Sequence, residues 1–221
     1  MNSRPVIAAC GAVDAEGIAG TAGVRFAWDA DTSAPGTGRT FRAVFGRSDE
    51  TFRRLDATSR ALVLAAEAAG ITQLLSVQRR ENTALIVETS LGCLDADLQF
   101  AQSLGAEMPD APMFPYTLPS TCLGEVALRH GLRGPTVCLS VGPGDQGSAL
   151  AEAARLLAAG EVEAAVCGSV EVLTRSVPGA EAVCIAVVAL LVASSLGLPA
   201  VATWPCSGGD PFAALRNLLR A

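Results

Sequence analysis

Cysteine and histidine are the side chains of this sequence that could supply a nucleophile and a base. Its seven cysteines are scattered along the chain, at Cys10, Cys93, Cys122, Cys138, Cys167, Cys184 and Cys206. The single histidine is His130, so chemistry that needs two histidines is impossible on this chain alone. A small stand-alone acyltransferase or hydrolase that uses a cysteine together with His130 is one class that these residues leave open.

Several other kinds of catalytic or binding site are excluded or disfavoured because the residues that they need are absent. All 16 basic residues are arginine, which excludes a Schiff-base lysine and a Walker-type phosphate-binding lysine within this chain. No CxxC pair occurs, which argues against a zinc site, and we expect no metal and no cofactor. The odd number of cysteines, with no recognisable secretory leader in residues 1–10, favours a reduced cytoplasm in which most cysteines are small buried hydrophobes.

A glycine-rich turn, Gly142-Pro143-Gly144-Asp145, is the other stretch with chemical potential. Such a turn at the start of a helix can hold a phosphate through its backbone N–H groups. The spacing here matches neither GxGxxG nor a Walker loop. Asp145 would repel an anion and would serve better as the N-cap of the following helix. We therefore do not expect phosphate binding.

The elements around this turn must position whatever it carries. Residues 136–141 are β-branched and apolar and predict a buried strand. Residues 146–159 are alanine-rich with apolar side chains on one face, which predicts a helix that stops at Gly160. Residues 164–170 predict a second buried strand. The order strand, turn, helix, strand indicates an α/β fold.

The rest of the chain predicts more elements of both kinds. Strands are expected at residues 5–14, 83–89, 183–192 and 200–204, and helices at 49–70, 94–104 and 211–219. Residues 121–132 are expected to form a helix followed by a loop. Loops are expected at residues 15–46, anchored by Phe26 and Trp28, and an irregular proline-rich segment at 108–120. The unbroken apolar run at 182–193 suits a fully buried strand better than a membrane span, because serine, glycine and proline follow it without a flanking basic residue.

Length and composition set the class of molecule. The 221 residues are enough for one domain, 1–221, with a sizeable core. Half of the residues are hydrophobic, which argues against disorder and favours a large interface with a protein partner. The net charge of -6 argues against nucleic acid as the main partner.

The central stretch resembles the heart of the ketosynthases of fatty-acid and polyketide synthesis. RHGLRGP at 129–135, AEAARLL at 151–157 and GSVE at 168–171 are similar to the family phrases GLKGP, AEAARLI and GxAE. FRRLDATSR at 52–60 is similar to the family's F-x-R-M-D…S-R. The resemblance covers roughly residues 52–171, and it implies a thiolase-like fold, a mixed sheet flanked by helices, equivalent to the N-terminal half of a conventional ketosynthase subunit.

The resemblance also implies that the catalytic centre has been lost. In the family the tight turn carries the nucleophilic cysteine, and an alignment without gaps places Pro143 at that position. Proline has neither a nucleophile nor a backbone N–H for an oxyanion. Some inactive relatives have a glutamine in place of the cysteine, but Gln146 is three residues late, which argues against a decarboxylase role.

Chain-length factors, the inactive partners of type II polyketide ketosynthases, are the relatives that the sequence resembles most. In them the start of the helix equivalent to residues 94–104 lines the tunnel for the growing chain, and bulky side chains there stop its growth. By position, Cys93, Ala96 and Phe100 correspond to these gate residues, and their spacing of three and four puts them on one helix face. Two of the three are small, so this gate should admit a long or rigid chain.

The resemblance further implies the partners. The active ketosynthase would be the second subunit of a heterodimer, and acyl carrier protein would act through the complex. Thiolase-fold dimers pair the strand before the nucleophile across the two-fold axis. By position this dimer interface comprises Thr136, Val137, Cys138, Leu139, Ser140 and Val141. Arg53 and Arg54 could contact the acidic carrier protein, although a solvated helix face is the favoured explanation.

Two alternatives to a chain-length-factor-like subunit remain open. One is the small cysteine acyltransferase or hydrolase described above. The other is a homodimeric protein that binds a small acyl ligand.

Overall fold

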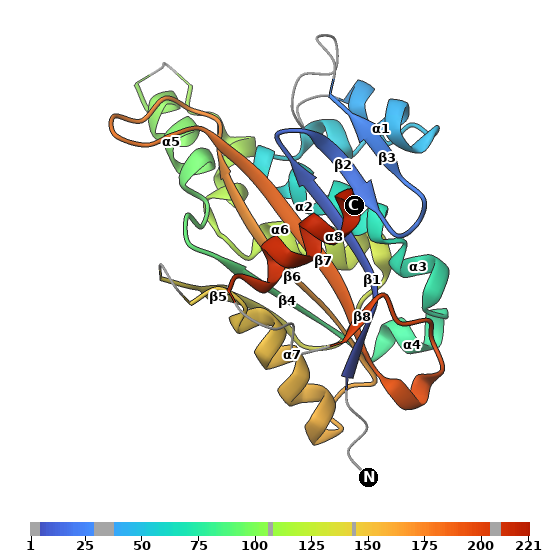
Figure 1. Ribbon diagram of the computed structural model, residues 1–221. Helices are drawn as coiled ribbons and strands as arrows, with labels where there is room; N and C mark the ends of the chain where they lie inside the picture. The colour runs from blue at the N-terminus through green and yellow to red at the C-terminus, as the bar shows by residue number, and fades with distance from the viewer. Residues whose placement is uncertain (1–4, 29–37, 106–107, 143–144, 204–208) are drawn as a thin grey trace.

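The computed structural model describes residues 5–28, 38–105, 108–142, 145–203 and 209–221 of the chain (Figure 1). Its strands are β1 Pro5–Asp14, β2 Gly17–Gly20, β3 Arg25–Ala27, β4 Thr83–Thr89, β5 Thr136–Ser140, β6 Ala164–Leu173, β7 Val183–Ala193 and β8 Ala202–Thr203. They form one 8-stranded sheet in the order β3-β2-β1-β7-β6-β4-β5, with β8 added beside β1. The sheet is mixed: β4 lies parallel to both β5 and β6, whereas β6, β7, β1 and β2 pair antiparallel in succession.

Helices cover both faces of this sheet. They are α1 Gly38–Phe45, η1 Phe52–Arg54, α2 Ala57–Ala69, α3 Ile71–Leu74, α4 Val77–Glu81, α5 Leu94–Ser103, η2 Ala111–Thr117, α6 Thr121–His130, α7 Ser148–Ala159, η3 Ser194–Leu196 and α8 Pro211–Arg220. Figure 1 shows α7 and α8 on one face of the sheet and α2 and α6 on the other. The expected mixed sheet flanked by helices is therefore confirmed.

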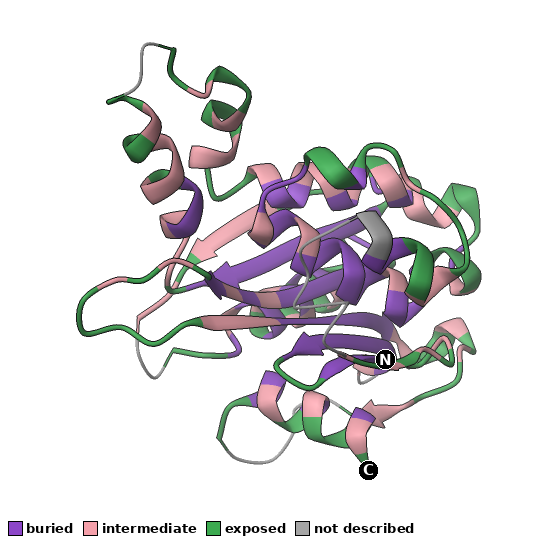
Figure 2. Cartoon of the chain, turned by 90° about the horizontal axis from the view of Figure 1, so that it is seen from above, coloured by how far each residue is buried: buried purple, intermediate pink, exposed green. Residues whose placement is uncertain are grey.

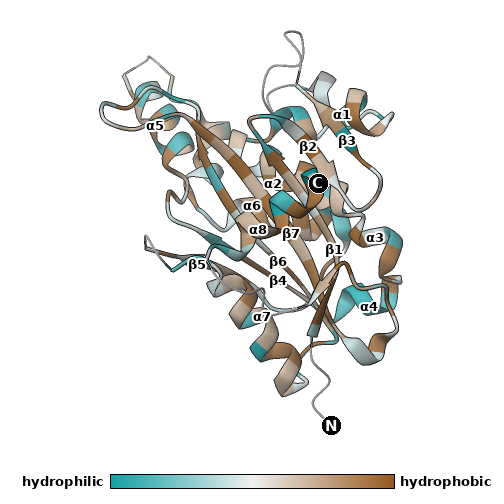
Figure 3. Cartoon of the chain, viewed as in Figure 1, coloured by the Kyte–Doolittle hydropathy of each residue, from teal (hydrophilic) through white to brown (hydrophobic). Residues whose placement is uncertain are grey.

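The apolar run at residues 182–193 forms β7, a strand that is buried on both faces. Alternate residues of β7 enter two different hydrophobic clusters: Ala186, Val188 and Leu190 pack toward α2, and Val187 and Ala189 pack toward α7 and α8. Buried residues accordingly concentrate in the sheet (Figure 2), and hydrophobic colour follows its central strands (Figure 3). No helix in the described part of the chain is long and apolar enough to cross a membrane.

Helix α2 lies unusually close to the sheet because two glycines leave room for its backbone. A Cβ atom on Gly11 of β1 would stand 2.1 Å from the Ala65 carbonyl oxygen, and one on Gly20 of β2 would stand 2.0 Å from that of Ala68. The helix begins later than the sequence predicts because the Asp56 carboxylate accepts hydrogen bonds from the first-turn N–H groups and so caps it. Two further short helices, α3 and α4, were not expected.

The prediction of loops throughout residues 15–46 is wrong for much of that stretch. Strands β2 and β3 extend the sheet beyond β1, and α1 follows them; residues 29–37 lie outside the described part. Glycine-rich sequence hid the strands, because β2 is GIAG and gains its order from pairing with β1. The expected anchors do pack: Phe26 and Trp28 make an edge contact, and the Trp28 indole donates to the Asp14 carbonyl.

Candidate functional site

The N-terminus of α7 is the place where the family resemblance puts a catalytic centre, and here it holds a buried carboxylate. Glu88 of β4 is 0% exposed and its side chain reaches this helix end. Its two oxygens accept hydrogen bonds from the backbone N–H groups of Gly147, at 2.8 Å, and Ala149, at 2.7 Å. Such bonds satisfy N–H groups that a helix start leaves unpaired, and the helix dipole favours the negative charge.

Burial and neighbouring charges act in opposite directions on Glu88. Burial raises the pKa of its carboxyl group, the two N–H donors lower it, and the carboxylates of Asp210 and Glu171 raise it further. No described cation forms an ion pair with Glu88, so the helix end supplies its main electrostatic support. Sequence reasoning missed Glu88. A glutamate within the apolar run of residues 83–89 was the available signal, because a charged residue in a buried strand indicates a specific polar partner.

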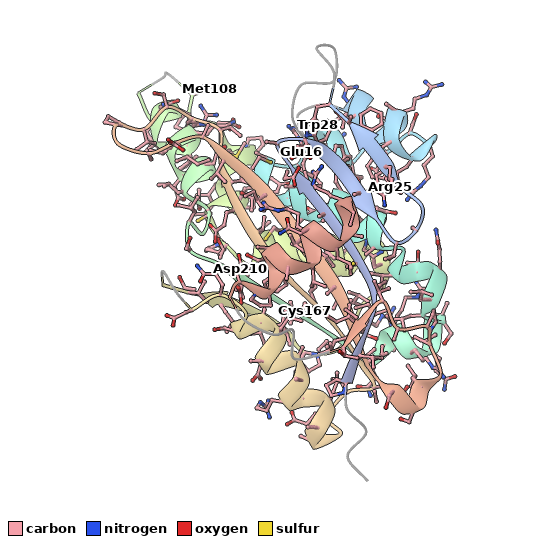
Figure 4. The ribbon with its side chains drawn as sticks, in the orientation of Figure 1. Glu16, Arg25, Trp28, Met108, Cys167 and Asp210 are labelled. Carbon is pink, nitrogen blue, oxygen red and sulfur yellow. The ribbon has the colours of Figure 1, made fainter. Side chains whose placement is uncertain are left out.

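The start of α8 packs against the N-terminus of α7. Gly147 has φ +99°, and a Cβ there would stand 2.8 Å from Cγ of Pro211, the first residue of α8. Asp210 caps α8 by accepting from the N–H groups of Phe212 and Ala213. Figure 4 labels Asp210 at the start of α8, on the face of the sheet that α7 covers. The N-termini of the two helices therefore meet, and each has its own carboxylate.

The glycine-rich turn itself is described only in part. Pro143, expected at the nucleophile position, and Gly144 lie outside the described residues. Asp145 was expected to cap α7, but the N-cap residue is Gly147, without a side-chain bond. Asp145 and Gln146 are instead exposed in the loop before it. Glu88 takes the capping role, because its carboxylate arrives from β4 beneath the helix end.

The described cysteines lack the surroundings of a reactive thiol. Burial raises the pKa of all six, which are Cys10, Cys93, Cys122, Cys138, Cys167 and Cys184. For Cys93 the value rises to about 11, with Asp97 contributing after burial. The thiolate is the nucleophilic form, so these shifts oppose reactivity near neutral pH. Cys206 lies outside the described residues.

His130 is buried at the end of α6. It forms no hydrogen bond to the sulfur of any described cysteine. It is 1% exposed, and neither ring nitrogen has a hydrogen-bond partner among the described residues. Burial, with the positive charges of Arg129, Arg47 and Arg80, lowers its pKa to about 4. This histidine therefore packs as a neutral ring.

The three expected gate residues lie along α5, from Cys93 at its N-cap to Phe100 in its second half, and have different surroundings. Cys93 lines a small cavity between α5, α2 and α6, and its sulfur lies 3.0 Å from the Thr117 carbonyl oxygen. Ala96 is 1% exposed. Phe100 is half-buried and its ring packs against Phe114, with centroids 5.5 Å apart. They share one side of the helix, but only Cys93 lines this cavity.

Strand β5, the expected dimer strand, is the edge of the sheet. It pairs with β4 alone, and its residues alternate between the two hydrophobic clusters: Val137 and Leu139 pack toward α7, and Cys138 toward α2 and α6. All three are only half-buried. An edge with apolar side chains on both faces is a surface that a further strand would cover well.

Residues 94–118, called the arm below, project beside the far end of β6 and β7 (Figure 1). Residues 106 and 107 of the arm lie outside the described part. The arm exposes four large apolar side chains: Leu104, Met108, Phe114 and Leu118, of which Met108 is 84% exposed. Figure 4 labels Met108 near its tip.

Arg53 and Arg54, the residues that could contact a carrier protein, are exposed on η1.

Comparison with known proteins agrees with this geometry. A family model described as the N-terminal domain of beta-ketoacyl synthase matches residues 27–186. Comparison with curated proteins gives no match.

Solved structures resemble the fold at low sequence identity. The ishigamide ketosynthase/chain length factor is 23% identical with a TM-score of 0.65, over 90% of this chain and 64% of that one. AntDE:AntF, a type II polyketide synthase carrier protein in complex with its ketosynthase, is 17% identical with a TM-score of 0.63, over 91% and 66%. The ketosynthase ApeO with its chain length factor ApeC, from Xenorhabdus doucetiae, is 16% identical with a TM-score of 0.58, over 86% and 79%. This chain thus spans less than two thirds of the length of the first.

Proposed function

We propose that this chain, which belongs to the beta-ketoacyl synthase family through its N-terminal domain, is a non-catalytic subunit that pairs with an active ketosynthase. Like a chain-length factor, it would complete a heterodimer and shape the tunnel for a growing polyketide or polyene chain. The partner would supply the cysteine and both histidines, and acyl carrier protein would deliver substrate to the complex.

The observation that carries this proposal is the free edge of β5. Its half-buried apolar side chains on both faces, next to the closed end of α7, suit pairing with a strand of another subunit. The exposed apolar residues of the arm offer a second surface that a partner would cover. Two of the similar solved structures are named as ketosynthases with their chain length factors.

The groups bound at the N-terminus of α7 support a subunit that has no catalytic activity of its own. An oxyanion needs unoccupied N–H donors. Here the donors of Gly147 and Ala149 already bind Glu88, and Pro211 packs over the turn. Pro143 at the nucleophile position remains part of the proposal on sequence grounds.

The gate role of Cys93, Ala96 and Phe100 belongs to the same proposal. It is supported by their shared side of α5. Small side chains at two of these positions would leave space for a long chain.

The first test is association. The chain would be co-expressed with a full-length ketosynthase encoded next to it and examined by size-exclusion chromatography with light scattering. A one-to-one complex supports the proposal. A homodimer or monomer that ignores the ketosynthase would favour the acyl-ligand-binding alternative.

A second test separates the enzyme alternative. The isolated chain and the complex would be treated with an acyl-thioester analogue and analysed by intact mass. We expect label on the ketosynthase alone. Stoichiometric label on a cysteine of this chain that disappears in His130→Leu would instead support a cysteine acyltransferase or hydrolase.

A further inference from the structure

Helix α5 carries the proposed gate, yet few apolar side chains fix its position. Its buried residues are Asp95 and Ala96. A helix that buries so little apolar surface against the sheet needs other contacts to hold one orientation. Asp95 itself is 4% exposed, so the buried side of α5 is in large part a carboxylate.

The Asp95 carboxylate binds the connection between β6 and β7. It accepts hydrogen bonds from the backbone N–H of Thr174 at 2.6 Å, the Thr174 hydroxyl at 2.9 Å and the backbone N–H of Arg175 at 3.2 Å. Hydrogen bonds to an ionised acceptor are stronger and more directional than neutral ones. This side of the contact therefore ties α5 to the residues directly after β6.

A second carboxylate makes the reciprocal contact. Glu171, near the end of β6, accepts from the backbone N–H of Ser90 at 2.5 Å and of Leu91 at 2.9 Å, in the turn between β4 and α5. Each segment thus presents one carboxylate to the backbone N–H groups of the other. We call these two acids and their donors the carboxylate clasp.

Arg175 extends the clasp along the helix. Its guanidinium donates to the side-chain oxygen of Gln99 at 2.8 Å and of Gln102 at 3.2 Å. Asp95, Gln99 and Gln102 are four and three residues apart and share one face of α5. The polar face of α5 is therefore bound over its whole length, which leaves the neighbouring face with Ala96 and Phe100 in a defined position.

We propose that Asp95 and Glu171 are positioning residues that set where the gate side of α5 stands, and through it the length of the acyl product. This rests on the proposed function, since it assumes that α5 lines the tunnel. Neither residue touches the chain. Each acts by fixing a helix whose displacement would change the free length of the tunnel.

The test uses the co-expressed complex with Asp95→Asn and Glu171→Gln, each of which keeps the size of the side chain. All three donors to Asp95 bind its Oδ1, so Asn keeps that acceptor and removes the carboxylate. The donors to Glu171 are divided between Oε1 and Oε2, so Gln turns an amide N–H₂ toward one of them. Glu163→Gln is the matched control, because Glu163 is exposed directly before β6, at the opposite end of that strand from Glu171. The readouts are complex formation, hydrogen exchange of α5 and the distribution of product lengths. A merely structural role would lower the yield of complex without moving that distribution.

We expect both clasp variants to form the complex, to exchange faster in α5 and at residues 174–175, and to change the ratio of adjacent product lengths by about tenfold, because small displacements at a reaction site have large effects. Glu163→Gln should leave all three readouts unchanged. An intact complex with faster exchange but an unaltered product distribution would overturn the inference while leaving the proposed function standing.

If Asp95→Asn does not fold, Thr174→Val provides the milder variant, since it removes one bond to Asp95 and keeps both backbone bonds. It should give the same direction of change with smaller amplitude, and no change would count against the inference. Failure of the unmodified chain to form any complex would instead contradict the proposed function.

Discussion

Glu88 and His130 are both buried ionisable residues, and they have opposite relations to their surroundings. Glu88 has two backbone donors and the end of a helix to stabilise its charge. His130 has no described hydrogen-bond partner and three arginines nearby, so its neutral form is favoured. The two residues therefore make separate predictions about stability.

Replacing Glu88 with alanine should destabilise the fold strongly. The change leaves the N–H groups of Gly147 and Ala149 buried without acceptors and opens a cavity under α7, at a combined cost of about 3 kcal/mol in the free energy of unfolding. Urea unfolding followed by circular dichroism measures it. Glu152→Ala, on the exposed face of the same helix, is the control and should be neutral. Equal stability of both variants would show that Glu88 does not hold α7.

His130 predicts a loss of stability at acid pH. Its folded pKa of about 4 lies below the ordinary value of 6.5. Between these values the unfolded chain binds a proton that the folded chain does not, so stability falls as the pH drops from 6.5 toward 4. The contribution approaches about 3 kcal/mol at the acid end. His130→Leu should remove it, which the difference between the two unfolding curves at pH 7 and pH 5 measures; parallel pH profiles would contradict the assignment.

At the scale of elements, the bonding pattern of β5 identifies which backbone groups are free. The Val141 N–H donates to the Thr89 carbonyl on β4. Bonding in a strand alternates with a period of two, so the N–H groups of Val137 and Leu139 also face β4 and those of Thr136, Cys138 and Ser140 point away from the sheet. The outward groups are the ones that a partner strand would use.

Cys138→Pro therefore separates pairing within the chain from pairing between chains. It removes an outward N–H and spares the bonds to β4, so the isolated chain should stay folded while the complex with the ketosynthase weakens by roughly tenfold or more in Kd. Cys138→Ser keeps the N–H and is the control. Titration of labelled chain with partner measures the Kd, and an unchanged value in the proline variant would exclude β5 from the interface.

The gate helix gives a prediction about products. Phe100→Ala removes the ring that packs on Phe114 and opens volume at the base of the arm, so product lengths should increase. Ala96→Trp should shorten them, but Ala96 is fully buried and the larger side chain will also strain the core. Mass spectrometry of products from the intact complex decides, and identical products from wild type and Phe100→Ala would remove Phe100 from the gate.

Elements with a strong local pattern could be predicted from the sequence. The apolar runs at residues 5–14 and 83–89 are strands at those bounds, and the alanine-rich helix before Gly160 ends where that glycine adopts a left-handed conformation. Strands β2 and β3 were missed because their order comes from pairing, β2 with β1 and β3 with β2, rather than from their own residues. The internal cap by Glu88 and the carboxylate clasp escaped because they join residues about 60 and 80 positions apart.

At the scale of the whole molecule, the surfaces that a partner protein could cover lie toward the end of the sheet that β5 forms. Strand β5 ends the sheet with half-buried apolar side chains, and the arm, beside the far end of β6 and β7, exposes apolar side chains. The end of α7 lies next to them and is closed by groups of the chain itself. Under the proposed function, a subunit with this arrangement would contribute surface and shape, and its partner would carry out bond formation.

The most direct measurement of this account is reconstituted elongation with purified ketosynthase, acyl carrier protein and extender units, with and without this chain. We predict that long-chain products form only when the chain is present, and that they persist when each of its cysteines in turn is replaced by serine. Elongation of equal rate and product length without the chain, or its loss on removal of one of the chain's cysteines, would contradict the assignment as a non-catalytic partner.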